Sequence, residues 1–153
     1  MAPRTFMAAT CMALLSLGTA TPLLAAGEYG TANEAQAMLQ RAGSALKADK
    51  SKALAEFTKG EDGFKDRDLY VFCAGPDGKV TGSGNPALIG QNLKDLKDKT
   101  GKPFGEEIFR TAEPGKPSEV SYMWPRPGST EPVQKTSFVQ KFEDQVCGVG
   151  YYK

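Results

Sequence analysis

The chain has 153 residues, with 19 Lys and Arg, 18 Asp and Glu and no histidine, so its formal net charge is only +1. This balance argues against nucleic acid or an anionic membrane as a partner, because binders of both kinds carry basic clusters. The absence of histidine excludes Ser–His and Cys–His nucleophile pairs and the usual zinc, copper and haem ligand sets. We therefore expect no enzymatic activity, no cofactor and no metal site.

Residues 1–26 have the layout of a secretory signal peptide. Arg4 supplies a positive start, residues 7–17 form a short apolar run, and small residues lead to a cleavage point after Ala26. The run is too short to span a bilayer, although a buried N-terminal helix would have a similar composition. We expect cleavage near Ala26, a periplasmic location, and a single mature domain at residues 27–153.

The segment 33–59 has the apolar spacing of a helix. Asn33 is a candidate N-terminal cap with Gln36 as the second member of a capping box, and Gly60 is a natural stop. The polar middle at residues 47–52 predicts a bend or a break. The alanine-rich stripe of this helix is also compatible with packing against a second copy of the chain, as a homodimer.

From residue 68 onward the pattern changes to strands. Aromatic and β-branched residues at 68–74 predict a strand that returns at 79–83 through a turn at 75–78. Strands separated from helices along the chain predict an α+β domain on an antiparallel sheet. The remaining expected elements are a long connection, a short helix and three strands, at residues 85–100, 103–112, 118–124, 133–142 and 145–152.

The cysteines are consistent with an oxidising compartment. Cys11 lies in the predicted signal peptide, which leaves Cys73 and Cys147, each in the middle of a predicted strand. An even pair in an exported protein predicts one disulfide. Two separate buried thiols that act as small apolar side chains are the alternative.

One lysine stands among apolar strand residues. Strand alternation places Lys135 and Ser137 on one face of their strand, and Tyr122 and Trp124 on one face of the preceding strand. A lysine in such a position is unusual unless its ammonium is paired or exposed. If Lys135 points into a cleft beside the two aromatic residues, it forms a site for a small carboxylate. If it lies on a wet face with its stem on a ring, it has no such role.

Several motifs follow one another in a fixed order: D-L-Y-V-F at 68–72, G-K-V at 78–80, N-P-A-L-I-G-Q-N-L at 85–93, D-K-T-G-K-P-F at 98–104, Y-M-W-P-R-P at 122–127, K-T-S-F-V at 135–139 and G-V-G-Y-Y at 148–152. This ordered set resembles single Cache domains, the extracytoplasmic sensor modules of bacterial receptors. The resemblance covers nearly all of residues 27–153. It implies a PAS-like antiparallel sheet of five or six strands, a long N-terminal helix across one face, and a helical excursion between strands.

The resemblance also implies a pocket between the other face of the sheet and the excursion, where family members bind small metabolites, often short carboxylates. Lys135 would anchor the anion, and the aromatic residues would form the walls. The family topology places the first and last strands side by side, which supports a Cys73–Cys147 disulfide. The candidate ligand-binding residues that it implies are Tyr70, Phe72, Asn85, Leu88, Phe104, Tyr122, Trp124, Lys135 and Ser137.

Two features depart from the family pattern. Phe138 stands where a tyrosine is usual, so one ligand-bonding hydroxyl is absent. The chain also lacks flanking membrane helices and a kinase or chemotaxis module, so we do not expect signalling to be internal to it. Either a separate membrane signalling protein reads its ligand state, or the domain only binds and carries its ligand. The sequence thus predicts a sensor-type domain that binds a small organic anion. The alternative is a structural or partner-binding envelope protein whose pocket is filled by its own side chains.

Overall fold

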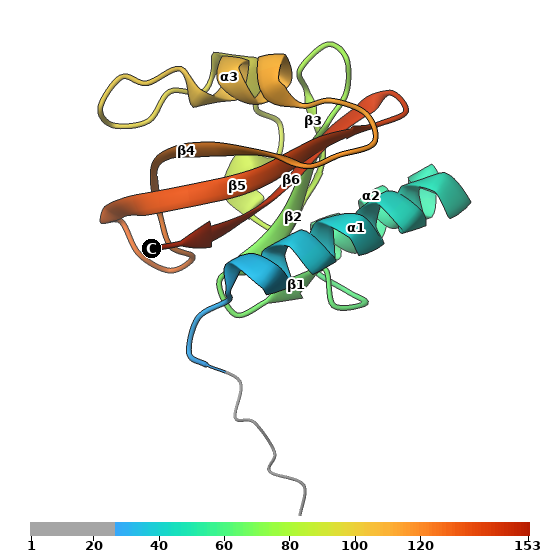
Figure 1. The fold of residues 1–153 in the computed structure, drawn as a ribbon, viewed down its shortest axis with the longest axis horizontal. Coiled ribbons are helices and arrows are strands. Elements are labelled where there is room, and N and C mark those ends of the chain that lie inside the picture. Colours follow the sequence, from blue (N-terminus) through green and yellow to red (C-terminus); the bar gives the residue numbers. More distant parts are fainter. Residues whose placement is uncertain (1–26) are drawn as a thin grey trace, which may run out of the picture.

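A computed structural model describes residues 27–153 (Figure 1). The predicted signal peptide lies outside the described residues. Within the described part, no helix is long and apolar enough to cross a membrane. The helices are α1 (Ala32–Ala48), α2 (Lys50–Lys59), α3 (Phe104–Thr111) and the short 3₁₀ turns η1 (Pro86–Leu88) and η2 (Leu93–Asp95). The strands are β1 (Lys65–Asp66), β2 (Leu69–Ala74), β3 (Val80–Ser83), β4 (Ser118–Pro125), β5 (Pro132–Phe142) and β6 (Gln145–Tyr152).

The N-cap of α1 lies two residues before the predicted one. Thr31, and not Asn33, is the N-cap: its hydroxyl accepts from the Glu34 backbone N–H at 3.3 Å, and the Glu34 carboxylate accepts from the Thr31 N–H at 2.7 Å. The reciprocal Thr–Glu bonds satisfy two N–H groups at once, and they draw an ionised carboxylate to the positive end of the helix. The predicted pair of Asn33 and Gln36 was therefore wrong.

The break predicted within residues 47–52 occurs at Asp49, whose backbone is extended (φ −158°, ψ 98°). Its side chain accepts from the Lys52 N–H at 3.0 Å, so the same residue ends α1 and caps α2. Gly60 ends α2 in the left-handed conformation at φ 71°, as predicted.

The strands form one antiparallel sheet in the order β1-β2-β6-β5-β4, with β3 also paired to β2. The predicted α+β fold class is confirmed, and β1 is an additional strand of two residues that the sequence analysis did not predict. Strands β2 and β6 lie side by side near the middle. Their register sets Cys73 opposite Cys147, and the two form the predicted disulfide.

Each face of the sheet is covered by a different set of helices. Figure 1 shows α1 and α2 on one side and α3 on the other. Phe138 and Phe142 of β5 belong to the core beneath α1, whereas Val139 belongs to the core beneath α3. Because successive strand residues point to opposite faces, this assignment also places Lys135 and Ser137 on the α3 side.

Candidate functional site

A small hollow lies between the α3 side of the sheet and the excursion that contains η1, η2 and α3. Its lining consists of Tyr70, Phe72, Leu88, Leu93, Phe104, Tyr122 and Trp124. All but one of these residues belong to the predicted set. Leu93 was missed, and the available signal was weak: an apolar side chain in a segment otherwise rich in lysine and aspartate.

The hollow is almost filled by its own aromatic rings. Phe104 stacks on Tyr122, with 4.1 Å between ring centroids and an angle of 7° between planes. Trp124 meets Phe104 edge-on at 5.3 Å. The remaining space of about 10 Å³ has room for about one water molecule. The pocket is closed in this structure, and a ligand of several atoms requires the rings to move.

Lys135 is fully buried behind this hollow. In the β-sheet it stands opposite Tyr122 of β4 and Tyr152 of β6. Its Nζ donates to the Tyr70 hydroxyl at 2.8 Å and lies 4.1 Å from the Tyr70 ring centroid and 4.8 Å from that of Tyr152. Within residues 27–153, no carboxylate lies within ion-pair distance of this ammonium.

Strand β6 makes room for the lysine by lacking a side chain at one position. A Cβ atom added at Gly150 would overlap Lys135 Cε and would stand 2.5 Å from Ser137 Oγ. The glycine of the G-V-G motif therefore permits a long cationic side chain to lie flat against the sheet.

Three predicted residues contact the hollow indirectly, through tyrosine hydroxyls. Lys135 and Asn85 both donate to the hydroxyl of Tyr70, the latter at 3.3 Å. The hydroxyls of Ser137 and Tyr122 share a hydrogen bond of 2.9 Å. The structure thus brings all nine predicted residues into one cluster, six in the wall and three one hydrogen bond behind it. Their role in binding a ligand stays a prediction.

The two tyrosine hydroxyls of the hollow differ in their electrostatic surroundings. Burial opposes ionisation of Tyr70, but the charge and the hydrogen bond of Lys135 outweigh it and lower the pKa of this phenol below its usual value. Burial, together with the neighbouring Tyr70, raises the pKa of Tyr122. The ammonium thus acts on the end of the hollow that Tyr70 forms.

The excursion is fastened to β4 by one buried carboxylate. Asp98 Oδ1 accepts from the backbone N–H of Thr100 (2.8 Å), the hydroxyl of Thr100 (2.6 Å) and the N–H of Lys102 (3.1 Å), while Oδ2 accepts from the N–H of Met123 (3.0 Å). Burial acts to raise the pKa of Asp98, but these hydrogen bonds lower it to about 2. The bond to Met123 holds the turn at residues 98–102 against β4. Helix α3 begins at Phe104, two residues after this turn.

Residues 32–152 match the family model of the Cache domain. The chain belongs to the Cache domain family. The match covers most of the chain, and it confirms the resemblance inferred from the ordered motifs. This Cache domain shares with its relatives the α+β architecture on which the candidate pocket is built.

Solved structures of chemotaxis proteins have the same fold. A methyl-accepting chemotaxis protein from Vibrio parahaemolyticus superposes with a TM-score of 0.64 at 23% identity, over 78% of this chain and 86% of that one. A periplasmic sensor domain of a chemotaxis protein gives 0.58 at 28% identity, over 78% and 88%. A Cache chemosensory domain whose structure describes carboxylic acid recognition gives 0.56 at 28% identity, over 78% and 86%.

A curated relative is the methyl-accepting chemotaxis protein McpP of Pseudomonas putida. It is 37% identical over 70 residues, which are 44% of this chain and 13% of that protein. The matched region is thus a small part of a much longer receptor.

Proposed function

We propose that this Cache domain is a periplasmic sensor module that binds a small carboxylate reversibly and without catalysis. The observation that carries the proposal is the Lys135 ammonium, which is fully buried and has no carboxylate partner among residues 27–153. A buried charge is costly unless it is paired. A ligand carboxylate supplies the missing anion, and a charge-assisted hydrogen bond of this kind contributes about 1.5–3 kcal/mol.

The dimensions of the hollow favour a ligand with few heavy atoms. Its walls are apolar rings, so the part of the ligand beyond the carboxylate is expected to be short and apolar. For the ligand to enter, Phe104 and Trp124 must swing away from Tyr122. The excursion supports such a movement because it turns at two exposed glycines in the left-handed conformation, Gly90 (φ 81°) and Gly101 (φ 88°).

The relatives support the same role. One similar solved protein is a Cache chemosensory domain with carboxylic acid recognition, and another is a periplasmic sensor domain. By analogy, we propose that the ligand state of this domain is transmitted to a membrane signalling protein. The fold is shared by domains of many functions, so the choice of a carboxylate follows from Lys135.

A second candidate function follows from the stacking of Phe104 on Tyr122. If these rings are a permanent filling, the domain is a structural or partner-binding envelope protein without a small ligand. In that case Lys135 is stabilised only by the Tyr70 hydroxyl and the faces of two tyrosine rings.

The single tryptophan of the chain, Trp124, lies in the wall of the hollow and reports on it directly. We expect a two- to four-carbon carboxylate, tested as acetate, propionate and succinate, to shift the fluorescence of Trp124 in residues 27–153 and to raise the melting temperature. Lys135→Met should weaken binding by about tenfold or more, because it removes the charge-assisted bond. Isothermal titration calorimetry measures the affinity.

Lys94→Met is the matched control. The ammonium of Lys94 also lies over an aromatic ring, that of Phe109 at 4.6 Å, but outside the hollow. This variant should bind as the parent does. Equal affinities of the parent and Lys135→Met would remove Lys135 from the site. If acetate, propionate and succinate all fail to bind the parent, the second candidate function is favoured.

A further inference from the structure

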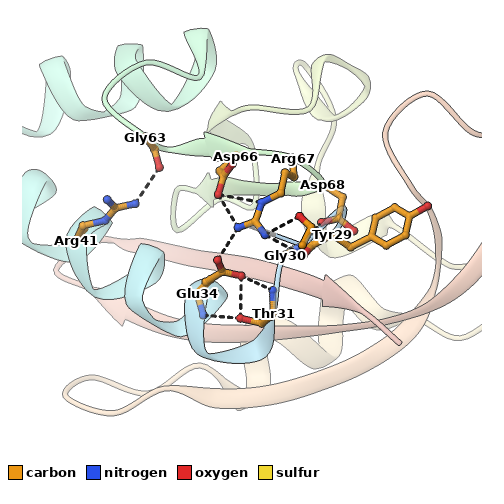
Figure 2. Close-up of polar contacts among 10 residues, drawn as sticks. Tyr29, Gly30, Thr31, Glu34, Arg41, Gly63, Asp66, Arg67 and Asp68 are labelled. Atoms are coloured by element: carbon orange, nitrogen blue, oxygen red, sulfur yellow. Dashed lines mark hydrogen bonds and ion pairs between the residues drawn. The ribbon is translucent and has the colours of Figure 1, made fainter. Parts of the chain in front are cut away.

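The segment before α1, residues 27–31, is docked on the loop between β1 and β2, and we call it the strap. Arg67 Nη1 donates to the carbonyls of Gly27 (3.2 Å) and Tyr29 (2.9 Å). The Gly30 N–H donates to Asp68 Oδ1 at 2.7 Å. Figure 2 shows Tyr29, Gly30, Arg67 and Asp68 converging beside the first turn of α1. The backbone of the strap is thus hydrogen-bonded to the side chains of two consecutive residues, Arg67 and Asp68.

Arg67 is itself held in place by two carboxylates. Its Nη2 contacts Glu34 at 2.6 Å and Asp66 at 2.7 Å, as Figure 2 shows. Glu34 belongs to the capping box of α1, so the docked strap and the start of the helix share one network. Arg41, drawn in the same view, bonds to Gly63 at 2.9 Å and makes no hydrogen bond to the strap.

A second arginine connects the strap to the sheet. Asp68 is buried, and its Oδ2 accepts from Arg126 Nε at 3.3 Å. The guanidinium of Arg126 lies 4.3 Å from the ring centroid of Tyr29 in the strap and 5.0 Å from that of Tyr152 in β6. Arg126 therefore contacts the strap directly and through Asp68.

Tyr152 completes the path to the pocket. Its hydroxyl donates to the Pro125 carbonyl at 2.9 Å, which fixes the ring. Two cations approach this ring, Arg126 from the strap side of the path and Lys135 from the pocket side at 4.8 Å. Since both are positive, they repel one another across a single aromatic side chain.

We propose that docking of the strap and occupation of the pocket favour each other through Asp68, Arg126 and Tyr152. A carboxylate bound at Lys135 neutralises one of the two cations, which lets Arg126 settle on Tyr152 and Asp68 and tightens the strap. By thermodynamic reciprocity, a docked strap increases the affinity for the anion by the same factor. The effect of a bound carboxylate on the strap rests on the proposed function. The effect of the Lys135 charge on the strap does not need a ligand.

The coupling is testable without any ligand, through hydrogen exchange of the Gly30 amide measured by NMR. Lys135→Met removes one of the two cations, so exchange at Gly30 should slow severalfold relative to the parent. Arg126→Gln should accelerate it, because Asp68 and Tyr29 lose their shared partner. Lys94→Met, which removes a lysine remote from the path, should leave it unchanged. Identical exchange in Lys135→Met and the parent would overturn the proposal.

The reciprocal arm uses the carboxylate that the parent binds best among acetate, propionate and succinate. Arg67→Gln loosens the strap and should weaken binding by about fivefold or more, whereas Arg41→Gln should not change it. Tyr29→Ala serves as a second loosening variant if Arg67→Gln does not fold. Unchanged affinity together with faster Gly30 exchange would refute the coupling. If the parent binds no carboxylate, the proposed function fails, and the ligand-free measurement still decides the coupling.

Discussion

Lys135 and Asp98 are both buried charged residues, but their charges are satisfied in different ways. The Asp98 carboxylate accepts four hydrogen bonds from the protein. The Lys135 ammonium has three hydrogens to donate and makes one hydrogen bond, to Tyr70, with ring faces around it. We infer that Asp98 serves the structure, whereas Lys135 is kept available for an anion.

Asp98→Asn should lower the free energy of unfolding by about 1–3 kcal/mol, because an amide cannot accept on both of its arms and carries no charge. The Met123 N–H or the Thr100 and Lys102 donors then lose their acceptor. Urea denaturation at pH 7 measures the change. Asp95→Asn, an exposed aspartate three residues earlier, is the control and should stay within about 0.5 kcal/mol of the parent.

The contribution of Asp98 should also depend on pH. Its pKa is lowered to about 2 in the folded state from an ordinary 3.8, so the unfolded chain binds the proton more readily. The stabilisation is therefore complete above about pH 4 and is lost as the pH falls towards 2. Melting temperatures measured between these limits should converge for the parent and Asp98→Asn. A constant gap across this range would contradict the assignment.

Among the elements, α1 packs tightly against β5 at Gly43. A Cβ atom at this position would overlap the ring of Phe142 in β5. Alanine is the better helix former by about 1 kcal/mol, so a purely local view expects Gly43→Ala to stabilise the helix. Packing gives the opposite expectation, because the aromatic ring fills the place that the methyl group needs.

Gly43→Ala should accordingly lower the melting temperature, with a net loss of about 1–3 kcal/mol from overpacking. Ser44→Ala, at the exposed neighbouring position, is the control and should be neutral or slightly stabilising. Chemical denaturation compares the two variants. A Gly43→Ala variant as stable as the parent would show that α1 can shift away from β5 at little cost.

Across the whole molecule, the Cys73–Cys147 disulfide joins residues 74 positions apart and ties the first hairpin to the last strand. A cross-link over a loop of this length stabilises the folded state by about 4 kcal/mol in the chain-entropy model. The double variant Cys73→Ala, Cys147→Ala should lose most of this stability, and a reductant should reproduce the loss in the parent. Thermal denaturation with and without reductant checks this. A reductant effect that persists in the double variant would contradict it.

The elements and the faces of the strands could be predicted because they depend on local pattern. Strands 118–124, 133–142 and 145–152 were placed within a residue of β4, β5 and β6, since alternation and turn residues are properties of short segments. The cap of α1 was misplaced because two overlapping segments, at Thr31 and at Asn33, have capping-box spacing. Strand β1 was missed because it has only two residues, both exposed, which is too short for an alternation of apolar and polar side chains to be recognised.

For the candidate site too, local features could be predicted from the sequence, whereas contacts between distant segments could not. The sequence by itself determined that histidine chemistry is excluded, that Lys135 and Ser137 share one face of their strand and Tyr122 and Trp124 one face of theirs, and, through the ordered motifs, which family the chain resembles. The pairing of β4 with β5, which brings these two faces together, came from the structure. Only the tertiary structure decided that Leu93 joins the wall, that Phe104 closes the hollow, and that Arg126 links the strap to Tyr152. The reason is physical: the direction of a side chain follows from the backbone period, whereas its neighbours follow from how distant segments pack.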